Sequence, residues 1–123
     1  MHALIIEDEA FTSVTIQDVL ADHGCTSFDL ASSFDEALAA AGRRRPQMIT
    51  ADVVLAPGNG VDAVEAICAA GPIPVIFITG TGAEARRRCP DLIVIDKPFT
   101  VTQVADAVRT LTGKMEAGKA ATT

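Results

Sequence analysis

Five polar residues suited to phosphoryl or metal chemistry each stand at the end of a short apolar run of the chain. They are Glu7, Asp8, Asp52, Thr79 and Lys97. Apolar runs of this length, separated by helix-like segments, are typical of parallel strands that are buried on both faces of a sheet. Ligands bind beyond the carboxyl ends of the strands in such sheets. We therefore expect three carboxylates, a hydroxyl and an ammonium to meet at one edge of one sheet.

The three acids are candidates for a metal site. Two carboxylates about 5 Å apart repel each other by roughly 3 kcal/mol at an effective dielectric constant near 20. Carboxylate oxygens with room left for water suit Mg²⁺ or Mn²⁺. Glu7 and Asp8 could instead cap the helix that follows them, because a helix N-terminus favours negative charge. The presence of Asp52 on a second central strand favours the Mg²⁺ site.

Asp52 is the candidate nucleophile. A carboxylate beside Mg²⁺ can attack a phosphoryl group and form an aspartyl phosphate. Asp52 ends the central predicted strand, and a loop rich in Gly and Asn follows it. The Thr79 hydroxyl and the Lys97 ammonium could then stabilise two different phosphoryl oxygens. Each also has a simpler interpretation, Thr79 as a strand residue and Lys97 as a solvated lysine, and only their shared edge favours the functional one.

Strands and helices that would position these residues alternate along the chain. Strands are predicted over residues 3–7, 25–30, 47–52, 73–79 and 92–96. Helices are predicted over about 10–23, from the capping box at Ser33 to Gly42, from Asn59 to Gly71, and from a second capping box at Thr100 to Leu111. Pro90 leaves space for at most two helical turns between the last two strands. The order predicts an α/β fold: a doubly wound five-stranded parallel sheet of order 2-1-3-4-5, in a flavodoxin-like three-layer sandwich with a shortened fourth helix.

Length and composition limit the possible partners. The 123 residues suit one domain over 1–112, and residues 113–123, which have no apolar period, are predicted to form a disordered tail. Sixteen acids against ten bases argue against a nucleic-acid partner. No apolar run is long enough to span a membrane and no signal peptide is visible, so a cytoplasmic protein without a membrane partner is predicted. Cys25, Cys68 and Cys89 have no C-x-x-C spacing and are expected to be unreactive thiols.

The set of motifs resembles the receiver domain of two-component response regulators over residues 3–112. The acidic pair, the lone Asp52, Thr79 before a glycine and Lys97-Pro98-Phe99 match in order and spacing. The resemblance implies a binding module, not an enzyme, that takes a phosphoryl group onto Asp52 from a histidine kinase or phosphotransfer protein and then acts on a downstream protein. It also implies Mg²⁺ ligation by Asp8, Asp52 and the backbone carbonyl of Val54, with Glu7 acting mainly through water. In this family the Lys-Pro bond is usually cis.

Two departures from the common receiver pattern concern the response to phosphorylation. Val94 stands where most receivers have Tyr or Phe, and the interval from Thr79 to Lys97 is shorter by about one helical turn. In these respects the chain resembles atypical receivers of alphaproteobacteria that lack the aromatic switch, often stand alone and often pair with kinases of the HWE class. Without a large ring to move, we expect residues 80–91 to carry the response, because glycines and few apolar anchors make this segment easy to reorder.

Two other functions remain open. An Mg²⁺-dependent aspartyl-phosphate phosphatase would need a second acid close behind the nucleophile, whereas three apolar residues follow Asp52. A pseudo-receiver would bind partners without phosphorylation; the intact Asp52, Thr79 and Lys97 argue against it, and Val94 leaves it open. The arginine runs 43–45 and 86–88 are predicted to be solvated, and His2 and His23 to be structural or exposed.

Overall fold

The protein, described from a computed structural model, is built on a five-stranded parallel sheet. The backbone of residues 1–122 and the side chains of residues 1–114 are described. The strands are β1 (His2–Ile6), β2 (Ser27–Ala31), β3 (Met48–Ala51), β6 (Val75–Thr79) and β7 (Ile93–Asp96). They lie in the order β2-β1-β3-β6-β7, and all pairs are parallel. The predicted α/β fold and strand order are therefore confirmed.

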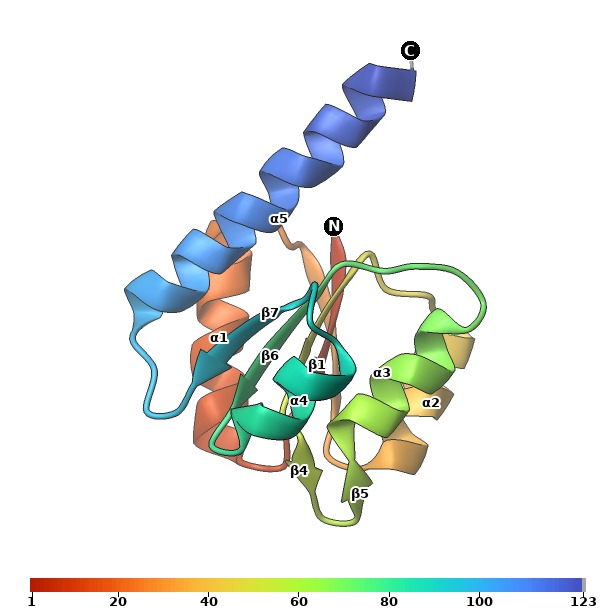
Figure 1. The fold of residues 1–123 in the computed structure, drawn as a ribbon, viewed down its shortest axis with the longest axis vertical. Helices are drawn as coiled ribbons and strands as arrows, with labels where there is room; N and C mark the ends of the chain where they lie inside the picture. Colours follow the sequence, from red (N-terminus) through yellow and green to blue (C-terminus); the bar gives the residue numbers. More distant parts are fainter. Residues whose placement is uncertain (123) are drawn as a thin grey trace.

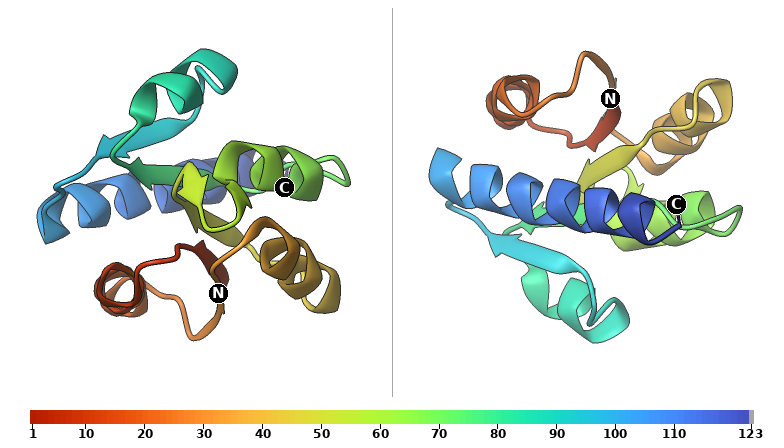
Figure 2. Two further views of the ribbon diagram at one scale, coloured as in Figure 1. Left: turned by 90° about the horizontal axis from the view of Figure 1, so that it is seen from below. Right: turned by 90° about the horizontal axis from the view of Figure 1, so that it is seen from above.

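Helices cover both faces of the sheet and give the three-layer arrangement (Figures 1 and 2). On one face lie α1 (Ala10–Asp22) and α5 (Val101–Thr122), and on the other lie α2 (Phe34–Arg43), α3 (Gly60–Cys68) and α4 (Gly82–Arg88). Each face has its own apolar core, because neighbouring strand residues point to opposite faces. The central strands are buried throughout, which explains their continuous apolar sequences.

Both predicted capping boxes mark the start of a helix. At α2, the Glu36 backbone N–H donates to Oγ of Ser33 over 3.2 Å. At α5 the exchange is reciprocal: the Gln103 backbone N–H donates to Oγ1 of Thr100 over 3.1 Å, and the Thr100 backbone N–H donates to Oε1 of Gln103 over 2.8 Å. Such caps satisfy backbone donors that a helix leaves unpaired. They fix where α2 and α5 begin at the carboxyl edge of the sheet.

A two-stranded hairpin follows Asp52 and was not predicted. It pairs β4 (Val54–Leu55) with β5 (Gly58–Asn59) in antiparallel fashion. The Ala56–Pro57 peptide bond in its turn is cis, as is Lys97–Pro98. Gly58 has φ +115°, and a Cβ there would lie 2.7 Å from Cβ of Phe34. The loop after the candidate nucleophile is therefore packed closely against the start of α2.

Helix α4 is short, as the sequence predicted. It has seven residues, and Gly82 and Ala85 are its buried members. A Cβ on Gly82 would lie 3.1 Å from Cγ1 of Val94 and 2.7 Å from Oδ1 of Asp96, so the start of α4 rests directly on β7. The position of α4 depends on few apolar contacts.

Helix α5 is longer than predicted and extends past the sheet to Thr122 (Figure 1). This backbone differs from the disordered tail predicted for residues 113–123. Lys, Met, Glu and Ala after Gly113 have high helix propensity but form no apolar stripe. A prediction based on apolar periodicity therefore misses this part of the helix. The domain limit at residue 112 stays a prediction, and the side chains after Lys114 lie outside the described residues. In the described part of the chain, no helix combines the length and apolar character needed to cross a membrane.

Candidate functional site

The predicted acids come together at the carboxyl edge of the sheet. β1 and β3 are paired in register up to Ile6 and Ala51, so Glu7 and Asp52 follow at the same level. One carboxylate oxygen from each of Glu7, Asp8 and Asp52 lies within 4.8 Å of the others. Glu7 and Asp52 are buried and Asp8 is exposed, so the group opens to solvent on one side.

Lys97 joins two of these acids. Its Nζ atom donates to Oε1 of Glu7 over 2.5 Å and to Oδ2 of Asp52 over 2.8 Å. The Lys97 backbone N–H donates to the Thr79 carbonyl oxygen over 2.9 Å, which continues the pairing of β7 with β6 beyond the strand. The chain direction at the end of β7 therefore sends the lysine across the ends of β6 and β3 toward β1.

The charges of the site follow from burial and from this lysine. Burial raises the pKa of Glu7 to about 7; the Lys97 ammonium opposes this rise and the Asp52 carboxylate adds to it. Burial alone would raise the pKa of Asp52, but hydrogen bonds from Lys97 and Thr79 outweigh it and hold the pKa below its usual value. Burial would lower the pKa of Lys97, yet its hydrogen bonds to Asp52 and Glu7 shift it upward. At neutral pH, Asp52 is ionised and paired with an ammonium.

Thr79 is fully buried and lies between Asp52 and the start of α4. Its Oγ1 atom accepts a hydrogen bond from the Thr81 backbone N–H over 3.1 Å and from the Val53 backbone N–H over 3.4 Å. Val53 follows Asp52 directly, and Thr81 immediately precedes α4. The hydroxyl therefore contacts both the segment after the candidate nucleophile and the segment that begins the shortened helix.

The acids fit an Mg²⁺ ion. Oε2 of Glu7 is buried and has no hydrogen-bond partner among the described residues, which is costly for a carboxylate unless another group satisfies it. Mg²⁺ prefers oxygen ligands and keeps several of its waters. The three carboxylates provide the oxygens, and the exposed Asp8 leaves one side of the group open to water. The predicted contribution of the Val54 carbonyl stays a prediction; Val54 lies in β4, directly after the site.

Gly60 is a site residue that the sequence-based prediction missed. A Cβ on Gly60 would lie 1.6 Å from the carbonyl oxygen of Asp52, so only glycine fits where α3 begins against this backbone. The Gly60 backbone N–H also donates to the Val53 carbonyl oxygen over 2.7 Å. The sequence predicts loop geometry and a helix start at Asn59-Gly60, but nothing in the local sequence reveals which backbone the helix approaches.

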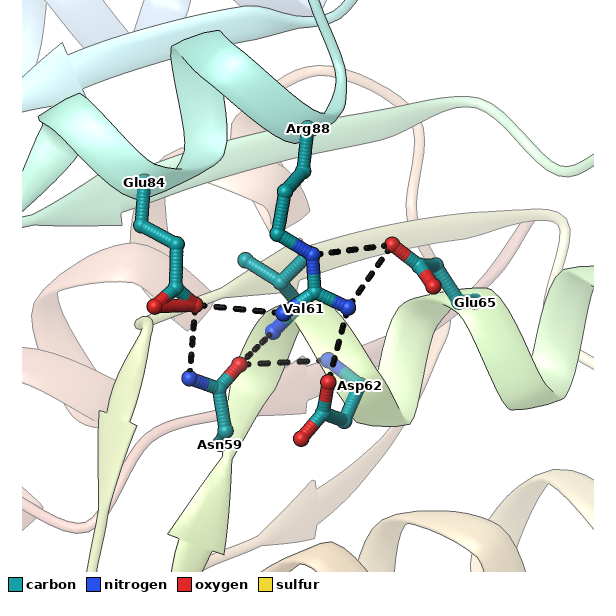
Figure 3. A network of polar contacts seen from close by, with 6 residues as sticks. All are labelled: Asn59, Val61, Asp62, Glu65, Glu84 and Arg88. Atoms are coloured by element: carbon teal, nitrogen blue, oxygen red, sulfur yellow. Dashed lines mark hydrogen bonds and ion pairs between the residues drawn. The ribbon is translucent and has the colours of Figure 1, made fainter.

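The arginine runs are exposed, as predicted, except at the half-buried Arg88, but three of their members have polar partners that were not predicted. Arg86 forms two hydrogen bonds with the carboxylate of Asp96, over 3.1 and 2.8 Å. Arg45 donates to the carbonyl oxygen of Gly71 over 2.5 Å. Arg88 lies in a network of acids from two helices (Figure 3). Most of these partners are distant in sequence, so the arginine runs alone do not reveal them.

The remaining expectations concern residues away from the site. His2 is buried between Oγ of Ser27 at 2.8 Å and Oδ2 of Asp29 at 2.9 Å, which fits the structural role predicted for it. It joins β1 to the edge strand β2. The three cysteines are free, and Cys25 is buried.

Comparisons with known proteins identify the class of this fold and site. A family profile described as the response regulator receiver domain matches residues 3–109. The chain belongs to the response regulator receiver domain family, which is a family of signalling modules. The predicted resemblance is therefore confirmed.

Individual relatives show the same similarity. Over 79 residues, or 64% of this chain, it is 33% identical to a protein-glutamate methylesterase/protein-glutamine glutaminase of Haloarcula marismortui, of which it spans 21%. Among solved structures, the response regulator PhyR from Brucella abortus matches with a TM-score of 0.85 at 30% identity, covering 98% of this chain and 51% of that one. The anti-anti-sigma factor PhyR from Bartonella quintana matches with a TM-score of 0.74 at 32% identity, covering 98% and 51%. The chain therefore spans about half or less of the length of these relatives.

Proposed function

We propose that this receiver domain takes a phosphoryl group onto Asp52 from the phosphohistidine of a kinase or phosphotransfer protein and that this changes its binding to a downstream protein. An Asp52 oxygen forms a bond to phosphorus while the bond from phosphorus to the histidine nitrogen breaks, and that nitrogen keeps the electron pair. The observation that supports this most is the pairing of the ionised Asp52 with Nζ of Lys97 at 2.8 Å. It keeps the nucleophile charged in a buried place.

The other site residues have separate roles in this proposal. Lys97 lies where an ammonium can stabilise the charge of an incoming phosphoryl oxygen. The Thr79 hydroxyl can reach a second oxygen once it leaves its contact with Thr81. Glu7, Asp8 and Asp52, with the Val54 carbonyl, would hold Mg²⁺, which when bound would neutralise charge on the phosphoryl group.

Exposed apolar side chains around the same edge support the docking of a protein donor. Phe11 in the first turn of α1 is 86% exposed, and Val14, Val54 and Val101 are each more than half exposed. They come from α1, the hairpin and the start of α5, which all lie at the carboxyl edge of the sheet (Figure 1). Apolar groups that surround a charged site are typical of a surface that a protein partner covers.

The decisive experiment is the mass of the intact protein after incubation with Mg²⁺ and acetyl phosphate. We expect one phosphoryl group that is labile to base, and its loss in Asp52→Asn, because an amide does not attack phosphorus. Asp91→Asn, which removes the same charge from an exposed position, should be labelled like the wild type. Labelling of Asp52→Asn at the wild-type level would place the chemistry on another residue.

A pseudo-receiver is the second candidate, and one observation favours it. Lys97 already pairs with both buried carboxylates, so each of them has a cation as its partner while Asp52 is unmodified. In this case the domain would bind a partner with its site unmodified, and the wild type would gain no mass from acetyl phosphate. For either candidate, the similarity to a protein named an anti-anti-sigma factor supports a regulatory protein as the downstream partner.

The phosphatase alternative gains no support, since Val53, Val54 and Leu55 bring no acid to the position that would protonate a leaving group.

A further inference from the structure

A cluster of polar side chains joins α4 to α3 (Figure 3). We call it the α3–α4 cluster, and its members are Asn59, Asp62, Glu65, Glu84 and Arg88. The guanidinium of Arg88, in the last turn of α4, donates to Asp62 over 2.7 Å and to Glu65 over 2.9 Å, both on α3. It also donates to Glu84, one turn earlier on α4, over 3.2 Å. One cation therefore serves three carboxylates from two helices.

The α3–α4 cluster also reaches the loop that follows the candidate phosphoacceptor. The Asn59 amide donates to Oε2 of Glu84 over 2.8 Å. The Oδ1 atom of Asn59 caps α3 by accepting from the backbone N–H of Val61 over 2.8 Å and of Asp62 over 3.2 Å. Asn59 ends the hairpin that begins two residues after Asp52, so Glu84 contacts the short segment that follows the nucleophile. A shift of that loop would therefore act on α4.

The opposite end of α4 contacts the site through Thr79. The Thr81 backbone N–H, which precedes the helix, donates to the Thr79 hydroxyl oxygen over 3.1 Å. Between these two attachments, α4 buries only Gly82 and Ala85. Because its apolar contacts are few, polar contacts at its two ends decide where α4 lies, and such an element has low local stability.

We infer that Arg88 is a positioning residue that holds α4 against α3 and the β4–β5 hairpin and that makes α4 respond to the state of Asp52. This inference rests on the proposed phosphorylation of Asp52. A phosphoryl group there would draw the Thr79 hydroxyl away from Thr81 and free the start of α4. Movement of α4 would then change the contacts of Arg88. The α3–α4 cluster would thus couple α4 to Asp52 in place of the aromatic switch residue that common receivers have at the position of Val94. Phosphorylation would in this way shift the population of α4 from one arrangement to another.

The test compares three variants by amide hydrogen exchange in the whole chain, with and without beryllofluoride and Mg²⁺ as a phosphoryl mimic. In Arg88→Gln without the mimic, we expect residues 82–88 to exchange about tenfold faster, as for the loss of several charge-assisted contacts. The mimic should then change their exchange much less than in the wild type. Arg87→Gln removes the same charge one residue earlier, where no contact is seen among the described side chains, and should behave as the wild type. Arg88→Lys keeps the charge and should restore part of the response.

The outcomes separate this inference from the proposed function. If Arg88→Gln exchanges like the wild type and responds fully to the mimic, Arg88 does not position α4 and the inference is wrong. If the wild type neither binds the mimic nor accepts a phosphoryl group, the proposed function fails, while faster exchange in Arg88→Gln would still show that Arg88 holds α4. Should Arg88→Gln not fold, Glu84→Gln removes a single charge from the same cluster and is expected to weaken the response in the same direction. Uptake of phosphoryl by Arg88→Gln should match the wild type, because Arg88 does not touch the site.

Discussion

The ammonium of Lys97 lies between two carboxylates from different strands, 2.8 Å from Asp52 and 2.5 Å from Glu7. The site is therefore organised around this lysine. Because burial raises the pKa of Glu7 to about 7, this acid titrates near neutral pH, and the local charge depends on pH and on any cation that enters.

Mg²⁺ should stabilise the fold. A cation that binds only the native site at ten times its dissociation constant adds about 1.4 kcal/mol to the free energy of unfolding, or a few degrees in melting temperature. Asp8→Asn should weaken the effect, because Asp8 belongs to the acid group and faces solvent. Asp18→Asn, which removes an exposed acid on α1 away from the acid group, is the control. A wild-type melting temperature indifferent to Mg²⁺ would exclude the metal site.

Without metal, Glu7 should make the protein less stable as pH rises through neutrality. Its pKa is raised from 4.5 to about 7 in the folded chain. Between these values the native state keeps a proton that the unfolded chain has released, so the free energy of unfolding falls with rising pH in this window. Urea unfolding at several pH values, compared between wild type and Glu7→Gln, isolates this group. Asp52 has the opposite sign: its lowered pKa gives stability that is lost only on strong acidification. Equal pH dependence of the two proteins would contradict the assignment.

Removal of the Lys97 ammonium should separate metal binding from phosphoryl transfer. Lys97→Met leaves the acids without their cation, so Mg²⁺ should bind at least as tightly as in the wild type. Phosphorylation by acetyl phosphate should slow by about 10²-fold or more, as for the loss of one preorganised charge stabiliser. Lys114→Met, beyond the site on α5, should change neither quantity. Time courses of the intact mass measure the rates, and an unchanged rate in Lys97→Met would remove Lys97 from the mechanism.

Gly60→Ala should destabilise the protein by about 2 kcal/mol or more, because the new methyl group would overlap the Asp52 carbonyl oxygen. Backbone on both sides of this contact leaves no flexible side chain to move away. Gly42→Ala in α2 is the matched control, since an added Cβ there meets nothing within 4 Å. It should be neutral or stabilising by about 0.5–1 kcal/mol. Denaturant unfolding of both variants measures the difference, and similar stability for the two would contradict the close packing.

Most of the fold could be predicted from the sequence because its signals are local. Apolar runs ending in Glu7, Asp52, Thr79 and Lys97 gave the strands and their shared edge, with boundaries within two residues of those observed. The capping box at Thr100 located the start of α5. Such patterns depend only on the period and end chemistry of each element.

Most of the contacts that could not be predicted join segments distant in the chain. The reach of Lys97 to Glu7 spans 90 positions, and no spacing rule selects this acid over Asp8. Arg88 finds Asp62 and Glu65 across 26 and 23 positions. The hairpin after Asp52 was missed because each of its strands has only two residues, which is too short to show the alternation of apolar and polar residues that indicates a strand.

The contact of Gly82 with Val94 links the two departures of this chain from common receivers. A single added carbon at position 82 would already crowd Cγ1 of Val94 at 3.1 Å. A tyrosine or phenylalanine at position 94 would need the space that the first turn of α4 now fills, and so would push that turn off β7. The short helix and the missing ring are thus one packing solution, and the two positions are expected to vary together among related sequences. Installing an aromatic residue at 94 alone would displace α4 instead of supplying the common switch.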